Sequence, residues 1–218
     1  SQLAEPAWAK KAKEGRASDI KPCINCLIGC IDRGMLSHTP IHCTVNPSLY
    51  RFECKPVEKA ETRKQVAVVG AGPAGCEAAL TASKRGHQVT IYEKRCIGGA
   101  MIEASKPENK ANIKRLIHYY EDHIMHDPNI TLVKEEVEYE TLVHSGYDAV
   151  IIAVGGKTRI LNVPGIEKNS VIYASDYLNG STAVTGNTVV VIGGGITGAE
   201  TALELNAEGK KVTIVEMT

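Results

Sequence analysis

The chain has 218 residues, of which 43% are hydrophobic, and its 25 basic and 25 acidic side chains give a formal net charge of zero at pH 7. This composition is enough for an ordinary core, in one large domain or two small ones. The even mixture of charges argues against a nucleic-acid partner. No apolar run reaches the ~20 residues of a membrane span, and the first residues lack the apolar core of a signal peptide. We therefore expect a cytoplasmic protein that binds small molecules or protein surfaces.

Two segments without strand patterns come first. Residues 1–20 are rich in Ala and Lys and helical in character, and we expect them to have no core of their own. Residues 21–60, here called the cysteine segment, are predicted to be loops because prolines interrupt them repeatedly. Their last residues begin a charged linker, EKAETRK, that leads to the first regular pattern.

A glycine-rich turn between two apolar strands is the first motif. The pattern predicts a strand over 65–69, a helix over about 74–85 and a strand over 88–93. Gly70, Gly72 and Gly75 have the G-x-G-x-x-G spacing and are here called the first glycine motif. Gly70 permits the tight turn, Gly72 lets the backbone approach a pyrophosphate, and Gly75 lets the helix pack on the strand. Glu93 would accept hydrogen bonds from an adenosine ribose, so the motif predicts a dinucleotide site.

The middle of the chain continues the alternation of strands and helices. We expect a helix over about 108–125, short strands over 131–134 and 137–139, and a buried-type strand in DAVIIAVGG (148–156). Four ring-bearing residues of the helix are expected to lie on a solvated polar face: Tyr119, Tyr120, His123 and His126.

A second glycine-rich turn has the same pattern of strand, turn, helix and strand as the first. A strand over 188–192, a helix over about 197–207 and a strand over 211–216 surround Gly193, Gly195 and Gly198, here called the second glycine motif. Glu216 ends the last strand, and an acid there without a following arginine favours NADH over NADPH. A motif that no longer binds a nucleotide is the alternative. Because buried parallel strands need neighbours and helices on both faces, we expect a three-layer α/β Rossmann-like fold and a fragment cut at both ends.

Four cysteines have the spacing of a metal site. Cys23, Cys26, Cys30 and Cys43 form C-x2-C-x3-C-x12-C, which favours a 4Fe-4S cluster over the competing structural zinc. His38 and His42 flank Cys43 and are expected to be solvated instead of ligating a metal. Three further cysteines are interpreted as small buried apolar side chains: Cys54, Cys76 and Cys96.

Family resemblance adds cofactors to these sites. GAGPAG followed by YEKRCIGG resembles the two-dinucleotide flavoproteins, which implies the ADP part of FAD at the first glycine motif and NAD(P)H at the second. By the same resemblance, Gly98 and Gly99 correspond to a glycine pair near the FAD pyrophosphate. Val137 resembles a residue whose backbone pairs with adenine, and residues 153–155 resemble the crossover between the two domains. The predicted cofactor-binding residues are Gly70, Gly72, Pro73, Ala74, Gly75, Glu93, Lys94, Gly98, Gly99, Val137, Ala153, Val154, Gly155, Gly193, Gly195, Ile196, Thr197, Gly198 and Glu216.

KPCINCLIGCIDR and HCTVNP, ahead of GAGPAG, resemble the NADH:flavin oxidoreductases related to 2,4-dienoyl-CoA reductase, 2-enoate reductase and trimethylamine dehydrogenase. The four cysteines map in order onto that family's cluster ligands. The resemblance implies that residues 1–20 are a linker from a missing FMN-binding TIM barrel, 21–60 bind the cluster, 61–160 begin an FAD domain and 161–218 begin an NAD(P)H domain.

The same resemblance implies an enzyme that passes electrons from NAD(P)H through FAD and the cluster to FMN, which reduces an enoate-type C=C bond. No side chain of this chain is expected to be catalytic. The alternative is a non-catalytic module that holds an adenine nucleotide and docks on an amine-dehydrogenase-like enzyme. Substrate, direction of electron flow and homo-oligomerisation of the full-length protein are left open.

Overall fold

The computed structural model describes residues 2–49 and 56–217. It divides into two compact units, the first made of residues 1–101 and 112–155 and the second of residues 102–111 and 156–218. No helix in the described ranges is both long and apolar enough to cross a membrane.

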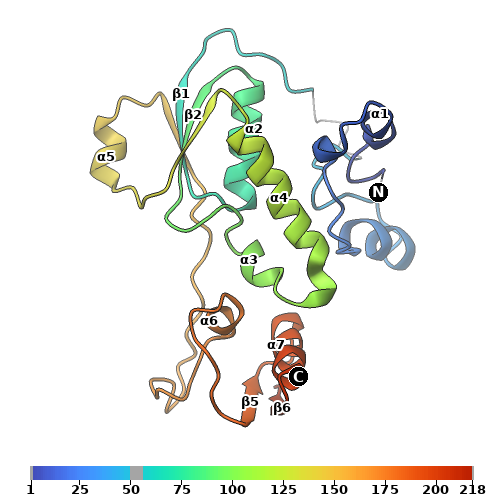
Figure 1. Ribbon diagram of the computed structural model, residues 1–218, viewed down its shortest axis with the longest axis vertical. Coiled ribbons are helices and arrows are strands. Elements are labelled where there is room, and N and C mark those ends of the chain that lie inside the picture. Colours follow the sequence, from blue (N-terminus) through green and yellow to red (C-terminus); the bar gives the residue numbers. More distant parts are fainter. Residues whose placement is uncertain (1, 50–55, 218) are drawn as a thin grey trace. The chain divides into compact units, whose positions relative to one another are not determined.

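The first unit is built on a four-stranded parallel sheet with the order β3-β2-β1-β4 (Figure 1). Its strands are β1 (Gln65–Val69), β2 (Gln88–Tyr92), β3 (Ile130–Val133) and β4 (Ala149–Ile152). In the register of the sheet, Val66 lies opposite Val89 on one side and Ala149 on the other. The expected strands are confirmed within a residue or two, except for the one over 137–139.

Helices lie on both sides of this sheet. Helix α2 (Pro73–Lys84) joins β1 to β2, α4 (Ala111–Met125) lies between β2 and β3, and α5 (Tyr139–His144) precedes β4. Figure 1 shows α2 and α4 on one side of the strands and α5 on the other. Two short elements come before α4 in the chain, α3 (Met101–Ala104) and η3 (Glu108–Lys110), and most of their residues belong to the second unit. The first unit is therefore α/β with three layers, as expected from right-handed crossovers.

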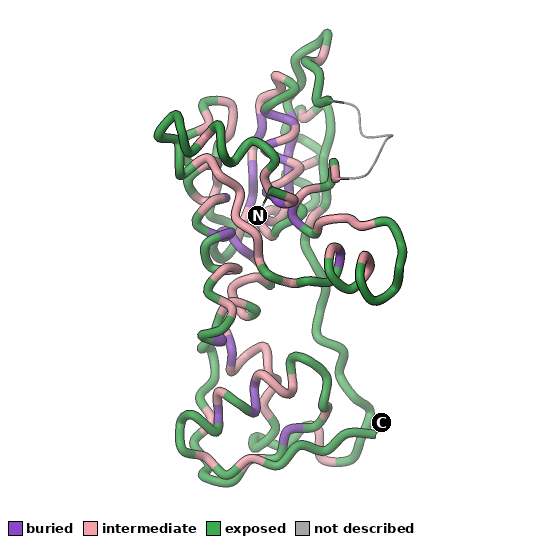
Figure 2. The backbone as a smooth tube through the Cα atoms, turned by 90° about the vertical axis from the view of Figure 1, so that its right-hand side faces the viewer, coloured by how far each residue is buried: buried purple, intermediate pink, exposed green. Residues whose placement is uncertain are grey.

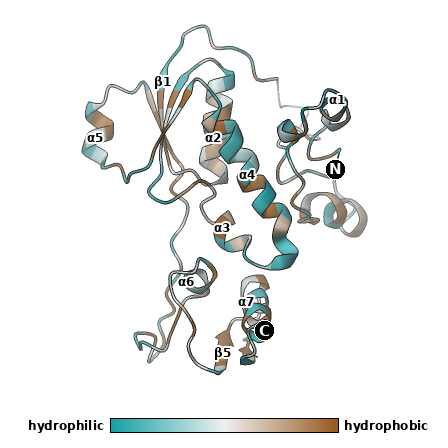
Figure 3. Ribbon diagram, in the orientation of Figure 1, coloured by the Kyte–Doolittle hydropathy of each residue, from teal (hydrophilic) through white to brown (hydrophobic). Residues whose placement is uncertain are grey.

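The core of the first unit lies between the sheet and the helices α2 and α4. Val68, Val89 and Ile91 of the strands are fully buried, and Ile124 of α4 is 1% exposed. Figure 2 shows the buried stretches running through these central elements, and the strands are among the hydrophobic segments in Figure 3. Burying each such side chain contributes about 1.5–3 kcal/mol, so this layer fixes the position of the turn after β1.

The cysteine segment contains more regular structure than its sequence predicts. Two short helices precede it, α1 (Trp8–Lys13) and η1 (Ala17–Asp19), and within it a π-helix, η2, spans Ile28–Leu36. The prediction of loops was wrong here because the stretch between Pro22 and Pro40 has no proline and keeps every backbone donor. Ala4 and Val45 are buried against the main core, so residues near the N-terminus do share a core.

Two further expectations for the first unit were wrong. Val137 lies outside regular structure, because Glu138 is extended (φ −81°, ψ 154°) and begins α5 instead of a strand. Strand β4 was expected to be buried, but its residues are exposed, with Ile152 at 65%. Among the described strands it pairs with β1 alone, so it forms an edge of the sheet.

The second unit has a small parallel sheet of β5 (Thr188–Ile192) and β6 (Lys211–Val215). Helix α7 (Ile196–Ala207) connects these strands, and α6 (Ala174–Leu178) precedes them. Val191, Ala202 and Leu205 form its buried core. Among the described residues of this unit, the sheet consists of these two strands.

Candidate functional site

The first glycine motif forms the turn between β1 and α2. Gly70 has φ +100°, in the left-handed region that favours glycine, and its N–H donates to the carbonyl of Tyr92 at 2.7 Å. Gly75 is buried in the first turn of α2, where a Cβ atom would overlap the carbonyl oxygen of Gly70. The tight turn and the close packing of helix on strand are thus both present, as the spacing predicts.

Gly72 lies next to the glycine pair formed by Gly98 and Gly99. It precedes Pro73 at the start of α2, and the N–H of Gly98 donates to the carbonyl of Ala71 at 2.8 Å. Gly99 has φ +53°, and a Cβ there would lie 2.8 Å from the Cα of Gly72. A side chain on Gly99 would therefore collide with the backbone of Gly72. Backbone N–H groups at the start of a helix favour negative charge, so this corner suits a diphosphate.

Glu93 follows β2 and turns its carboxylate back to the same turn. Its Oε2 accepts from the N–H of Ala71 at 2.8 Å, and its Oε1 accepts from the N–H of Arg95 at 2.8 Å. The acid is half-buried. Both carboxylate oxygens keep lone pairs that could accept from ribose hydroxyls, so the geometry suits the predicted role.

The remaining predicted residues of this site lie on three segments. Ala153, after β4, crosses beside Gly70, and its N–H donates to the carbonyl of Val69 at 2.8 Å. Lys94, just after β2, forms an ion pair with Glu136, next to Val137, at 2.8 Å. Hydrogen bonding to that carboxylate raises the pKa of Lys94. Pro73 and Ala74 are exposed on the first turn of α2, and Val154 and Gly155 are exposed after Ala153.

The second glycine motif repeats this geometry in the second unit. Gly193 has φ +105°, and a Cβ on Gly198 would overlap the carbonyl oxygen of Gly193. Gly195 precedes α7 and has open space around it, with Ile196 and Thr197 exposed beside it on the first turn. Glu216 accepts from the N–H of Gly194, as Glu93 does from Ala71. The structure therefore contains the same turn twice.

The four cysteines of the predicted cluster lie on one folded segment and are all half-buried. Its two arms meet where the N–H of His42 donates to the carbonyl of Gly29 at 2.8 Å. Cys26 lies 3.1 Å from the hydroxyl of Thr44, and the Sγ of Cys23 accepts from the N–H of Asn25 at 3.4 Å.

Among residues 2–49 and 56–217, no three His, Cys, Asp or Glu side chains lie close enough to hold a metal ion. The cluster site therefore stays a prediction. Its donor set does suit a cluster, since thiolates are the ordinary ligands of iron–sulfur centres and four of them share one hydrogen-bonded segment.

The cysteines outside this segment differ from one another. Cys76 is buried in α2, and its Sγ donates to the carbonyl of Ala71 at 3.3 Å. Burial raises the pKa of Cys76 to about 12, so the thiol is inert, as its interpretation as an apolar side chain requires. Cys96 is exposed, contrary to the expectation of burial. Cys54 lies outside the described residues.

The environments of two tyrosines of α4 were predicted wrongly, since Tyr119 is partly buried against the core and Tyr120 is buried. The side chain of Tyr120 is 2% exposed and its hydroxyl donates to Glu77 of α2 at 2.7 Å. The signal was present in the sequence, because Tyr120 shares a helical face with three apolar residues, Leu116, Ile117 and Ile124. Its aromatic ring belongs to that apolar stripe.

Fold and site together define a protein with two dinucleotide-binding turns of the Rossmann type. Residues 64–218 match the family described as pyridine nucleotide-disulphide oxidoreductase. The chain belongs to this family, and its relatives place it with the flavoprotein oxidoreductases related to 2-enoate reductase and trimethylamine dehydrogenase.

Three similar proteins show how far this likeness extends. An NADH oxidase of Thermoanaerobacter brockii is 41% identical over 220 residues, covering 99% of this chain and 34% of its own. A cinnamate reductase of Clostridium sporogenes is 35% identical over 217 residues, and the match covers 99% of this chain and 32% of the reductase. A 2-naphthoyl-CoA reductase, solved as a complex with 2-naphthoyl-CoA, is 34% identical and superposes with a TM-score of 0.90. The match covers 98% of this chain and 32% of the reductase chain. The chain thus spans about a third of the length of the curated relatives it matches.

Proposed function

We propose that this chain is the electron-transfer part of a flavoprotein oxidoreductase that uses NAD(P)H to reduce an enoate-type C=C bond. The observation that carries the proposal is the repeated turn, with Glu93 bonded to Ala71 in one unit and Glu216 bonded to Gly194 in the other. Two such turns in one chain serve two dinucleotides, FAD at the first glycine motif and NAD(P)H at the second.

The residues of this chain bind and orient these groups and supply no acid or base. Gly72 and Gly99 leave room for a diphosphate beside the start of α2, while Glu93 and Glu216 each present a carboxylate to a ribose. When bound, nicotinamide and flavin supply hydride transfer, and a cluster supplies one-electron transfer. The chemistry of the cofactors thus depends on how the two turns hold them.

The cysteine segment would hold a 4Fe-4S cluster through Cys23, Cys26, Cys30 and Cys43. Support comes from the thiol donor set and from the bond between His42 and Gly29 that joins the two arms of the segment. An FMN-binding barrel elsewhere in a longer polypeptide would then receive the electrons. The named substrates of two relatives, cinnamate and 2-naphthoyl-CoA, are conjugated acyl compounds, which supports a C=C bond as the final acceptor.

Composition analysis of the anaerobically purified protein tests this assignment. We expect one FAD per chain together with about four irons and about four acid-labile sulfides. Cys26→Ser should lose iron and keep FAD. Cys96→Ser, which changes an exposed cysteine outside the four-cysteine motif, should keep both. Stoichiometric zinc without iron would disprove the cluster.

Substrate reduction is tested separately. We expect NADH-dependent loss of the conjugated absorbance of a 2-enoate such as cinnamate. Reduction of the bound flavin by NADH without any loss of that absorbance would refute the enoate assignment and leave the nucleotide sites in place.

A further inference from the structure

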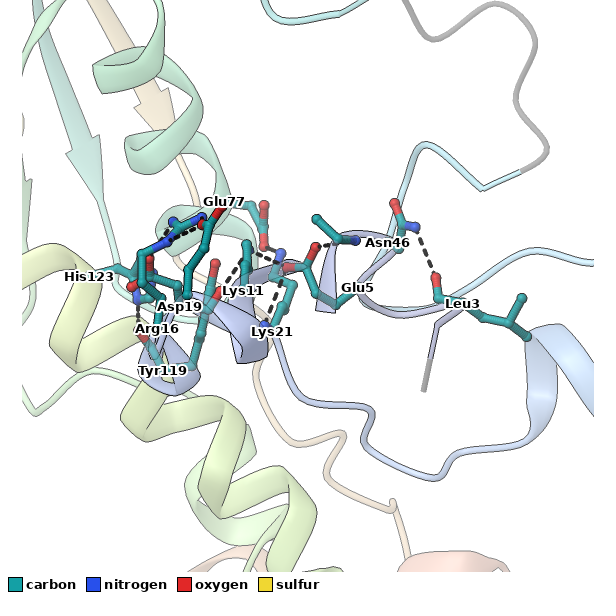
Figure 4. Close-up of polar contacts among 12 residues, drawn as sticks. Leu3, Glu5, Lys11, Arg16, Asp19, Lys21, Asn46, Glu77, Tyr119 and His123 are labelled. Carbon is teal, nitrogen blue, oxygen red and sulfur yellow. Dashed lines mark hydrogen bonds and ion pairs between the residues drawn. The ribbon is translucent and has the colours of Figure 1, made fainter. Parts of the chain in front are cut away.

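Lys21 lies two residues before Cys23 and reaches from the cysteine segment to the nucleotide-binding layer. Its side chain is 13% exposed, and its Nζ forms an ion pair with Oε1 of Glu77 (Figure 4). Glu77 belongs to α2, the helix whose first turn contains Gly75. A single side chain thus connects the cysteine segment to the helix that begins at the first glycine motif.

Glu77 is held by a second donor from a third element. The hydroxyl of Tyr120, on α4, donates to the same Oε1 at 2.7 Å. Burial and the nearby carboxylate of Glu77 raise the pKa of Tyr120, so the phenol stays protonated and remains a donor. The Nζ of Lys21 also lies 5.8 Å from the ring centre of Tyr119 and 5.6 Å from that of Tyr120, within cation–π range.

The backbone before Lys21 is fixed as well. The Nζ of Lys11 contacts Oε2 of Glu5 at 2.5 Å and donates to the carbonyl of Asp19 at 2.7 Å. The N–H of Lys21 donates to the same Glu5 oxygen at 3.5 Å. Figure 4 shows these side chains as one continuous set of polar contacts that ends at Glu77.

Apolar contacts continue the attachment beyond Lys21. Cys23, Ile24 and Cys43 pack against the core that contains Val68 and Tyr120. The polar and apolar contacts therefore join the same two parts of the unit, and the ion pair sets where along α2 the cysteine segment lies.

We propose that Lys21 is a positioning residue that, with Glu77 and Tyr120, fixes the cysteine segment on α2 and so sets the separation between the thiols and the nucleotide turn. This inference rests on the proposed function for its consequence in electron transfer. The attachment itself is a property of the chain. Because a charge-assisted bond needs both partners, removal of the ammonium should release the segment while the sheet stays folded.

The test compares four variants of the whole holoprotein: Lys21→Met, Lys21→Arg, Tyr120→Phe and, as a control, Lys10→Met. Lys10 comes from the same N-terminal region, but its side chain is 75% exposed. Hydrogen exchange of the amides of Ile31, Asp32 and His42, which are hydrogen-bonded within the cysteine segment, measures how firmly this segment is held. We expect Lys21→Met to speed this exchange at least about tenfold with β1 and β2 unchanged, Tyr120→Phe to act in the same direction but less, and Lys10→Met to match the unmutated protein. Lys21→Arg, which keeps the charge, should restore most of the protection.

The second readout is the optical change after rapid mixing with NADH. Because electron transfer slows as the distance between flavin and cluster grows, we expect Lys21→Met to slow bleaching of the cluster severalfold and to leave bleaching of the flavin unchanged. Unchanged exchange and unchanged cluster bleaching in Lys21→Met would overturn the inference. Absence of iron from the unmutated protein would instead refute the proposed function, while hydrogen exchange would still decide the attachment.

Discussion

The carboxylate of Glu93 accepts a hydrogen bond from the backbone N–H of Ala71 at 2.8 Å, and Glu216 makes the same contact with Gly194. Each acid thereby ties the end of one strand to the turn that follows the preceding strand. This contact places a negative charge beside the position that an adenosine ribose takes in Rossmann-type sites. We therefore expect the two sites to share a preference for a nucleotide with free ribose hydroxyls.

Glu216 should make NADH the better electron donor, because a carboxylate accepts from ribose hydroxyls and repels a 2′-phosphate. We expect Glu216→Ala to lower kcat/KM for NADH roughly ten- to a hundredfold and to weaken discrimination against NADPH, since hydrogen bonds to charged groups are worth about 1.5–3 kcal/mol. Steady-state kinetics with both donors measure this. Glu93→Ala is the matched control and should reduce FAD content instead. A strong preference for NADPH in the unmutated protein would contradict the assignment.

Gly75 and Gly72 should respond differently to the same substitution. A Cβ on Gly75 would overlap the carbonyl oxygen of Gly70, so Gly75→Ala should lower the free energy of unfolding by about 1–3 kcal/mol. Gly72 has φ −71°, and a Cβ there would lie 3.8 Å from Gly99, so Gly72→Ala should leave unfolding within about 0.5 kcal/mol. Its cost should appear as weaker FAD binding. Equal unfolding curves for the two variants would show that helix and strand do not pack as described.

Cys76 should resist alkylation where Cys96 reacts. The thiol of Cys76 is buried and its pKa is raised by burial to about 12 from an ordinary value of 9.0, whereas Cys96 is exposed. Because the folded-state pKa is raised, stability from this group is complete below about pH 9 and is lost as the pH rises towards 12. Mass spectrometry after iodoacetamide treatment at pH 8 should find Cys96 modified and Cys76 intact. Rapid labelling of Cys76 in folded protein would be inconsistent with its burial.

Acid should loosen the N-terminal residues through Glu5. Burial raises the pKa of Glu5, but hydrogen bonds from Lys11 and from the N–H of Ala7 outweigh this effect and leave it below 4.5. A lowered pKa contributes stability that is present above about 4.5 and is lost as the pH falls through the folded-state value. Hydrogen exchange of residues 2–21, corrected for intrinsic rates, should therefore rise as the pH falls below about 4.5. In Glu5→Gln the protection should be lower at pH 7 and change less with pH.

The glycine turns and their strands could be predicted from the sequence because each depends on local rules. Strand β1 and the positions of Gly70 and Gly193 follow from apolar runs and from spacing. The contact between Gly72 and Gly99 could be expected only from family resemblance, since nothing local places these residues side by side.

The features that sequence reasoning missed depend on tertiary contacts. Tyr120 has a polar atom but lies on the apolar face of α4, where its hydroxyl is satisfied by Glu77. The ion pair of Lys21 with Glu77 joins residues far apart in the chain, so no local pattern indicates it. For strand β4 the error is the opposite, because an exposed strand was expected to be buried. An apolar strand pattern indicates a buried environment but does not identify the segment that covers the strand.

Anaerobic reduction of the bound flavin by NADH tests the central claim most directly, because it requires both nucleotide sites in one protein. The decisive variant is Gly195→Val, since Gly195 has φ −65° and open space around it, so a side chain there should obstruct a nucleotide without disturbing the fold. We predict that the unmutated protein loses its flavin absorbance on addition of NADH, and that Gly195→Val retains FAD but is reduced at least about tenfold more slowly. Reduction of Gly195→Val at the unmutated rate, or loss of its FAD, would contradict the assignment of FAD to the first glycine motif and NAD(P)H to the second.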